Sequence, residues 1–242
     1  MLQPHLRTDE THGCRYALLP GDPARLDRIA PFLADVKELA YNREYRSISG
    51  VYKNIKVIAV STGIGGCSAG IAVEELARTG VKAMIRIGSC GAMQPEIGLG
   101  DLILAAGAVR DDGASRAYVD LRFPAVADTE LLNACLTAAR QNGITHHIGI
   151  VHSHESFYTD DEEEQKAFWA KRGVLGADME TAALFTIGRL RGIKTASVLN
   201  NVVICGTDTA DGIGNYASGK QATVQGEENE IRTALEAFAL LG

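Results

Sequence analysis

The sequence lacks both a long apolar run and an excess of positive charge. No segment approaches the length of a transmembrane helix, and the opening residues MLQPHLRTDETHGC contain no apolar core typical of a signal peptide. The formal net charge is −6 and the sequence pI is about 5.5. This balance argues against binding to nucleic acid or to an anionic membrane. Any anion must therefore be held by a few local cationic groups.

Paired cysteines are also missing. The five cysteines include no CxxC pair and are Cys14, Cys67, Cys90, Cys135 and Cys205. Their odd number and wide spacing argue against a disulfide framework or a zinc cluster and favour reduced thiols in a cytoplasmic protein. His152 and His154 would share one face of a strand, which leaves a metal site open from the residues alone.

Apolar runs alternate with helical patterns along the chain. The runs are typical of strands covered on both faces, and we expect them at 15–20, 56–61, 83–88, 101–109, 147–152 and 195–204. Helices are expected over 68–80, 128–143, 178–192 and 227–241. This alternation predicts an α/β fold whose mostly parallel or mixed sheet is covered by helices on both sides, in three layers. No repeat or linker divides residues 1–242, which we interpret as one domain.

One cation interrupts the strand pattern at 83–88. Arg86 lies inside the apolar run AMIRIG and is followed by GSCG. A guanidinium cannot lose its charge and is costly to bury without a partner. Arg86 either has a carboxylate partner that stabilises the fold or, near a strand's carboxyl end, binds an anionic ligand, and Ser89 supplies a hydroxyl there.

A second candidate anion site is the segment LLPGDPARLDRI at 18–29. Here a strand runs into Gly21, and Pro23 precedes a helical turn that carries Arg25. Main-chain N–H groups and the helix dipole at such a turn favour an anion. The alternative is an ordinary turn with a surface arginine.

A third segment, GADMETAALF at 176–185, places two acids before an apolar helix. Asp178 and Glu180 either cap that helix or supply a carboxylate that accepts hydrogen bonds from the paired hydroxyls of a sugar.

Seven motifs, taken in order, resemble the hexameric nucleoside phosphorylases, which include uridine phosphorylases and bacterial-type purine nucleoside phosphorylases. They are PGDPAR (20–25), AYNREY (40–45), STGIGGCSAGIAVEEL (61–76), IRIGSCGAMQP (85–95), FPAVAD (123–128), SFY (156–158) and DMETAALF (178–185). The resemblance covers nearly the whole chain. It implies a distorted central sheet, a dimer that completes each active site, and a homohexamer built as a trimer of dimers.

The resemblance also implies a role for individual residues. Phosphate would be bound by the main-chain N–H of Gly21, by Arg25, Arg86 and Ser89, and by Arg43 of the partner subunit. Ribose would be bound by Met179, Glu180 and His5 of the partner subunit. Phe157 would stack on the base, beside Cys90, Gly91, Val202 and Val203. Arg86 and Glu180 are the expected catalytic residues.

The implied reaction is phosphorolysis, in which the bond from ribose C1′ to a base nitrogen is exchanged for a bond to phosphate oxygen. The transition state resembles an oxocarbenium ion. Guanidiniums that fix the weak nucleophile on one face of the sugar can contribute about 7–11 kcal/mol, and the bound anion stabilises the cationic sugar. The resemblance thus implies a pentosyltransferase with inorganic phosphate as co-substrate and no other cofactor.

The base end departs from both branches of the family. Purine enzymes stabilise the leaving base with a late aspartate, and that position falls on Val203, with Asp208 and Asp211 shortly after it. Uridine phosphorylases bind uracil with a glutamine and an arginine in an insertion that is absent after Phe157–Tyr158. Possible substitutes are Gln165, Lys166 and Arg172, and the acidic run 160–164 either is solvated or accepts hydrogen bonds from the base.

Uridine phosphorolysis is the leading hypothesis, because STGIGG, RDDGAS (110–115) and FPAVAD favour that branch. A purine nucleoside phosphorylase, a nucleosidase that needs no phosphate, and a nucleoside-binding protein with weak catalysis remain alternatives. Some uridine phosphorylases bind potassium through a glutamate and a serine. Glu44 matches the glutamate, whereas the serine position aligns with Gly70, so we expect no metal.

Overall fold

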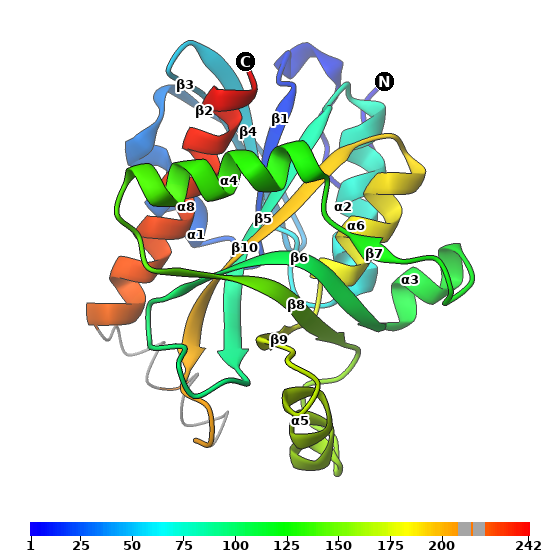
Figure 1. The fold of residues 1–242 in the computed structure, drawn as a ribbon. Coiled ribbons are helices and arrows are strands. Elements are labelled where there is room, and N and C mark those ends of the chain that lie inside the picture. Colours follow the sequence, from blue (N-terminus) through cyan, green and yellow to red (C-terminus); the bar gives the residue numbers. More distant parts are fainter. Residues whose placement is uncertain (208–213, 215–220) are drawn as a thin grey trace.

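One mixed β-sheet runs through the molecule (Figure 1). The computed structural model describes residues 1–207, 214 and 221–242. Its strands are β1 (Tyr16–Pro20), β2 (Ala34–Asn42), β3 (Tyr45–Tyr52), β4 (Ile55–Val60), β5 (Ala83–Ala92), β6 (Leu102–Asp111), β7 (Ala125–Val126), β8 (His146–His154), β9 (Gly176–Asp178) and β10 (Lys194–Val203).

The strand order is β10-β6-β8-β9-β5-β1-β4-β3-β2, with β7 on β6. Strand β5 also pairs with β10, so β5, β10, β6, β8 and β9 form a closed ring. Strand β1 is parallel to β4 and β5, and β5 is parallel to β10. Strand β6 runs antiparallel to β10, and β9 runs antiparallel to β5. The predicted α/β class and the distorted mixed sheet are confirmed.

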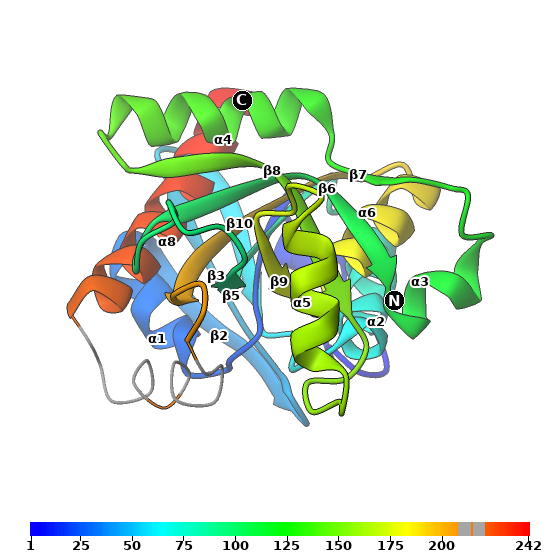
Figure 2. The ribbon, with the colours of Figure 1, turned by 60° about the horizontal axis from the view of Figure 1, so that its bottom comes forward.

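Helices cover both faces of the sheet (Figures 1 and 2). They are α1 (Arg25–Ile29), α2 (Gly66–Arg78), α3 (Gly113–Tyr118), α4 (Thr129–Gln141), α5 (Glu162–Ala170), α6 (Thr181–Leu190) and α8 (Gln221–Leu241), and 3₁₀ turns occupy Glu10–His12 and Ala30–Phe32. Leu76 and Phe185, from α2 and α6, belong to one core cluster, and Leu131 and Phe238, from α4 and α8, belong to the other. Burying these apolar faces on the sheet is the main force that holds the layers together.

The sequence predicted six of the strands and the longer helices but missed β2, β3 and several short elements. Strand β2 is mostly exposed, so it carries neither a continuous apolar run nor a clean alternation. Strand β3, the short strands β7 and β9 and the helix α3 were not expected either. In the described residues, no helix is both long and apolar enough to cross a membrane.

Candidate functional site

A cavity of about 880 Å³ opens at the carboxyl ends of β1, β4, β5 and β10. Parallel strands present ligand-binding residues at this edge because the connecting loops leave the sheet there. Helix α5 contributes Glu162, Glu163, Lys166, Ala167 and Ala170 to the cavity lining. The predicted site residues among its lining are Gly21, Arg25, Arg86, Ser89, Cys90, Gly91, Phe157, Met179, Glu180 and Val203.

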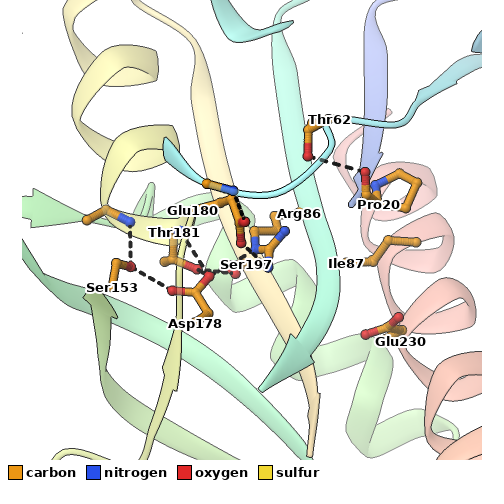
Figure 3. A network of polar contacts seen from close by, with 12 residues as sticks. Pro20, Thr62, Arg86, Ile87, Ser153, Asp178, Glu180, Thr181, Ser197 and Glu230 are labelled. Atoms are coloured by element: carbon orange, nitrogen blue, oxygen red, sulfur yellow. Dashed lines mark hydrogen bonds and ion pairs between the residues drawn. The ribbon is translucent and has the colours of Figure 1, made fainter. Parts of the chain in front are cut away.

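Arg86 is 6% exposed and is held by two carboxylates. Its Nε donates to Oδ2 of Asp178 at 2.9 Å, and its Nη2 lies 2.5 Å from Oε2 of Glu180 (Figure 3). Burial would lower the pKa of Arg86, but the two carboxylates outweigh burial and raise it. Arg86 thus has the carboxylate partners that one of its two interpretations requires, and it also lines the cavity, as the other interpretation requires. A Cβ at Gly88 would lie 2.7 Å from Nη2, so only glycine leaves room for this guanidinium.

Asp178 anchors the arrangement at the start of α6. Its Oδ1 accepts from Ser153 Oγ at 2.6 Å, and its Oδ2 accepts from the N–H and the hydroxyl of Thr181 at 3.0 and 2.6 Å (Figure 3). Burial alone would raise the pKa of Asp178, but Arg86 and these donors lower it below its usual range. The carboxylate thus stays charged, as the helix-capping interpretation expects, and fixes Arg86 as well.

Glu180 faces the cavity from the residue that precedes α6. Its Oε1 accepts from the main-chain N–H of Gly65 at 2.5 Å, while Oε2 contacts Arg86. It makes no side-chain cap, so the capping interpretation applies to Asp178 and not to Glu180. Burial raises the pKa of Glu180 despite the attraction of Arg86. A carboxyl held in this way can accept hydrogen bonds from ligand hydroxyls.

Arg25 forms the second cationic group of the cavity wall and is 5% exposed. Its Nη1 donates to Oε1 of Glu230 at 3.0 Å and to the carbonyl of Ile87 at 3.2 Å, and its Nε lies 3.5 Å from Oε1 of Glu227. Sequence reasoning missed both glutamates. The two glutamates lie three residues apart on the buried face of α8, which also carries Ile231 and Phe238. An acid on an otherwise apolar helix face is the sequence pattern that could have revealed them.

Part of the cavity lining is apolar and aromatic. Phe157, Val203, Cys90 and Gly91 belong to this part. Burial and nearby carboxylates raise the pKa of Cys90 well above its usual value, so the thiol stays protonated there. Such residues suit the flat faces of a base better than a charged group.

Helix α5 contributes a cation and two acids to the same cavity. Lys166, Glu162 and Glu163 line the cavity, and Lys166 Nζ lies 2.7 Å from Oε1 of Glu162 and 2.9 Å from Oε1 of Glu163. Gln165 instead bonds Asp161 on the exposed side, and Arg172 stacks on Phe168 with its guanidinium carbon 3.4 Å from the ring centre. Of the three predicted substitutes, the structure brings Lys166 alone to the cavity.

Three predicted residues lie outside the lining. Val202 precedes Val203 on β10 and is 2% exposed. Its base contact stays a prediction. His5 bonds Glu75 of α2 through Nδ1 at 2.6 Å, and Arg43 is exposed in the turn between β2 and β3. Their roles in a partner's site stay predictions.

Two further expectations concern the rim. Asp208 and Asp211, the candidate acids for the leaving base, lie outside the described residues. The serine beside Glu44 is Ser68, whose hydroxyl donates to Glu44 Oε1 at 2.8 Å, whereas Gly70 faces Ile187. The assignment of the serine position to Gly70 is therefore wrong. The described residues hold no group of three or more His, Cys, Asp or Glu that could bind a metal ion.

Comparisons with known proteins agree on one family. Residues 15–241 match the model of the phosphorylase superfamily. A guanosine phosphorylase of Halorubrum lacusprofundi is 37% identical over 219 residues, covering 90% of this chain and 86% of that protein. The crystal structure of uridine phosphorylase from Vibrio fischeri is 45% identical with a TM-score of 0.92, covering 98% of this chain and 97% of that one. Purine nucleoside phosphorylase of Toxoplasma gondii, solved with immucillin-H, is 32% identical with a TM-score of 0.91, covering 99% and 96%.

Proposed function

This chain belongs to the phosphorylase superfamily, and from that membership and its cavity we propose that it cleaves ribonucleosides with phosphate. The products are the free base and ribose 1-phosphate, and uridine is the expected substrate. The observation that carries the proposal is the convergence of two buried guanidiniums, Arg25 and Arg86, with Glu180 in one cavity.

The positions of these groups fit the order of sugar and phosphate along the cavity. Arg25, Arg86, Ser89 and the N–H of Gly21 would hold phosphate, while Glu180 beside Arg86 accepts from the ribose hydroxyls, with Met179 against the sugar. Phosphate is then fixed below C1′, which turns a bimolecular attack into a nearly unimolecular one. Its charge stabilises the oxocarbenium ion. The scheme needs no covalent intermediate and no cofactor besides phosphate.

Asp178 and Glu180 contact different nitrogens of the Arg86 guanidinium. Asp178 binds Nε and is itself held by Ser153 and Thr181, so this contact orients the guanidinium. Glu180 binds Nη2, the side that an oxyanion would share. When ribose hydroxyls engage Glu180, phosphate gains access to that side of Arg86. This coupling favours binding of both substrates together.

The site is proposed to be complete only in a dimer. Arg43 is an exposed cation beside Glu44, which lines the cavity rim, and His5 is more than a third exposed in its side chain. In this proposal, Arg43 of the partner subunit reaches the phosphate and His5 of the partner subunit reaches the ribose. Three such dimers would form the hexamer implied by the family resemblance.

A purine base is the second candidate, because one of the relatives is a guanosine phosphorylase. Lys166 places a donor beside the acceptors Glu162 and Glu163, which is the complement of a carbonyl next to a ring N–H. Uracil and 6-oxopurines both carry that pair. The guanosine phosphorylase relative makes guanosine and inosine the purines to test.

The test is a product assay with purified protein, uridine, inosine and guanosine, each with and without inorganic phosphate. We expect base and ribose 1-phosphate only when phosphate is present, with uridine preferred. Release of the base at the same rate with and without phosphate would identify a nucleosidase. Tight nucleoside binding without product over the whole panel would identify a binding protein, and a strong preference for inosine or guanosine would move the assignment to the purine branch.

A further inference from the structure

The proposed phosphate site holds more carboxyl groups than guanidiniums. In the described part of the chain, the guanidiniums of Arg25 and Arg86 contact four carboxyls, those of Asp178, Glu180, Glu227 and Glu230. Arg28 also binds Glu227, from a half-exposed position. A phosphate dianion would therefore enter a wall whose cations are already paired with acids. Like charges at such distances in a buried site repel strongly.

Glu230 is the carboxyl least suited to remain charged there. It is fully buried on α8, and its Oε1 lies 3.0 Å from Nη1 of Arg25. The charged or titratable groups that face it are Arg25 from α1, Arg86 and Cys90 from β5, and Glu227 one turn earlier on α8. Burial and Glu227 oppose its charge, whereas the two arginines favour it.

The balance of these effects puts the titration of Glu230 near neutral pH. Burial raises the pKa of Glu230 to about 8 although Arg25 and Arg86 lower it. When Glu230 is ionised, it competes with any oxyanion for the guanidinium of Arg25. When it is protonated, the guanidinium keeps a hydrogen-bonding partner but loses an anionic one. Placing another anion on Arg25 must therefore favour the protonated form.

We infer that oxyanion binding in this cavity and protonation of Glu230 are coupled: the oxyanion takes the guanidinium of Arg25, and Glu230 accepts one proton from solvent. The inference rests on the proposed phosphate site and makes Glu230 a positioning residue that tunes it. The proton forms an O–H bond on the Glu230 carboxyl, and no other bond changes. By linkage, oxyanion affinity falls as pH rises through the range in which free Glu230 ionises.

Sulfate is the suitable probe because, unlike phosphate, it does not itself titrate between pH 7 and 9. Calorimetry of sulfate binding in two buffers of different ionisation enthalpy counts the protons taken up. At pH 8 we expect uptake of about half a proton per site, since half of the free sites already carry one. The association constant should fall about tenfold between pH 7 and 9.

Two variants separate the coupling from other effects. Glu230→Gln keeps the shape of the protonated acid, so sulfate should bind with no proton uptake at this site and with little pH dependence. Glu228→Gln removes the same charge from an exposed position of the same helix and should leave uptake unchanged. Phosphorolysis assays should show an altered pH dependence of the phosphate KM in Glu230→Gln, with the nucleoside KM unchanged.

The outcomes distinguish the coupling from the proposed function. Sulfate binding without proton uptake in the wild-type protein, or uptake that persists undiminished in Glu230→Gln, would overturn the coupling and leave the phosphate site standing. Absence of binding for both sulfate and phosphate, together with no phosphorolysis, would overturn the phosphate site itself. If Glu230→Gln does not fold, the wild-type pH dependence decides: an association constant that is flat from pH 7 to 9 refutes the inference.

Discussion

Replacing Arg86 by alanine tests whether the anion-binding arginine also holds the fold. The substitution leaves Asp178 and Glu180 buried without the cation that lies 2.9 and 2.5 Å from them. Breaking a buried ion pair by removing one partner costs about 3–5 kcal/mol, because the remaining charge is uncompensated. We therefore expect Arg86→Ala to lower the free energy of unfolding by about that amount at pH 7.5, and to abolish phosphorolysis.

The loss of stability caused by Arg86→Ala should depend on pH. In the wild-type protein, the pKa of Asp178 is below its usual range, so its pairing stabilises the fold above that range and is lost only as pH falls through the lowered pKa. Without Arg86, burial raises the pKa of both carboxyls, and protonation relieves the repulsion. The loss of stability should then be largest near pH 8 and decrease toward pH 5.

Denaturant unfolding at pH 5, 6.5 and 8 measures this difference. The matched control is Arg116→Ala, because Arg116 is half exposed and lies 3.7 Å from Asp111, a pair that should contribute less than about 1 kcal/mol. Adding Asp178→Asn to Arg86→Ala removes one orphaned charge and should restore part of the stability. If Arg86→Ala unfolds like the wild-type protein at all three pH values, the two ion pairs do not stabilise the fold and the reasoning fails.

Three further predictions concern the catalytic groups. Glu180→Gln should lower kcat/KM for uridine roughly 10- to 100-fold, since a hydrogen bond to a charged group contributes about 1.5–3 kcal/mol; unchanged kinetics would exclude ribose binding by Glu180. Lys166→Met should reduce kcat/KM roughly tenfold or more, with the phosphate KM unchanged. The control is Lys171→Met, because Lys171 is exposed and does not line the cavity. Equal effects of the two substitutions would contradict a contact between Lys166 and the base. Chains carrying Arg43→Ala and chains carrying Glu180→Gln should each be strongly impaired. Refolding equal amounts of them together should raise activity to about a quarter of the wild-type value, because half of random dimers hold one intact site out of two. No recovery on mixing would contradict a site shared between subunits.

The sequence was informative where burial imposes a pattern. Continuous apolar runs revealed the strands that become β1, β4, β5, β6, β8 and β10. The helix expected over 128–143 is α4, and Asp128 caps it by accepting from Leu131 N–H at 3.0 Å. Gly80 follows the end of α2 with a φ of 98°, as a helix stop requires. Strand β2 escaped detection because its side chains are mostly exposed.

The partners of the cationic groups could not be predicted, because they depend on contacts between distant segments. Arg86 was recognised as anomalous from its neighbours, but its partner Asp178 is 92 residues away. Arg25 meets Glu230 across 205 residues. Helix periodicity places these acids on a buried face, but it does not say which cation they meet. The sequence thus predicted which residues line the cavity better than it predicted their charge state.

The contact between Arg25 and α8 has a consequence for truncated forms of the protein. The described lining of the cavity lies between Gly21 and Thr207, whereas Glu227 and Glu230, the two acids that orient Arg25, follow that segment on α8. A chain that ends before α8 has the guanidinium without these two acids. Deleting α8 should therefore impair anion binding in a pocket whose described lining comes from other elements.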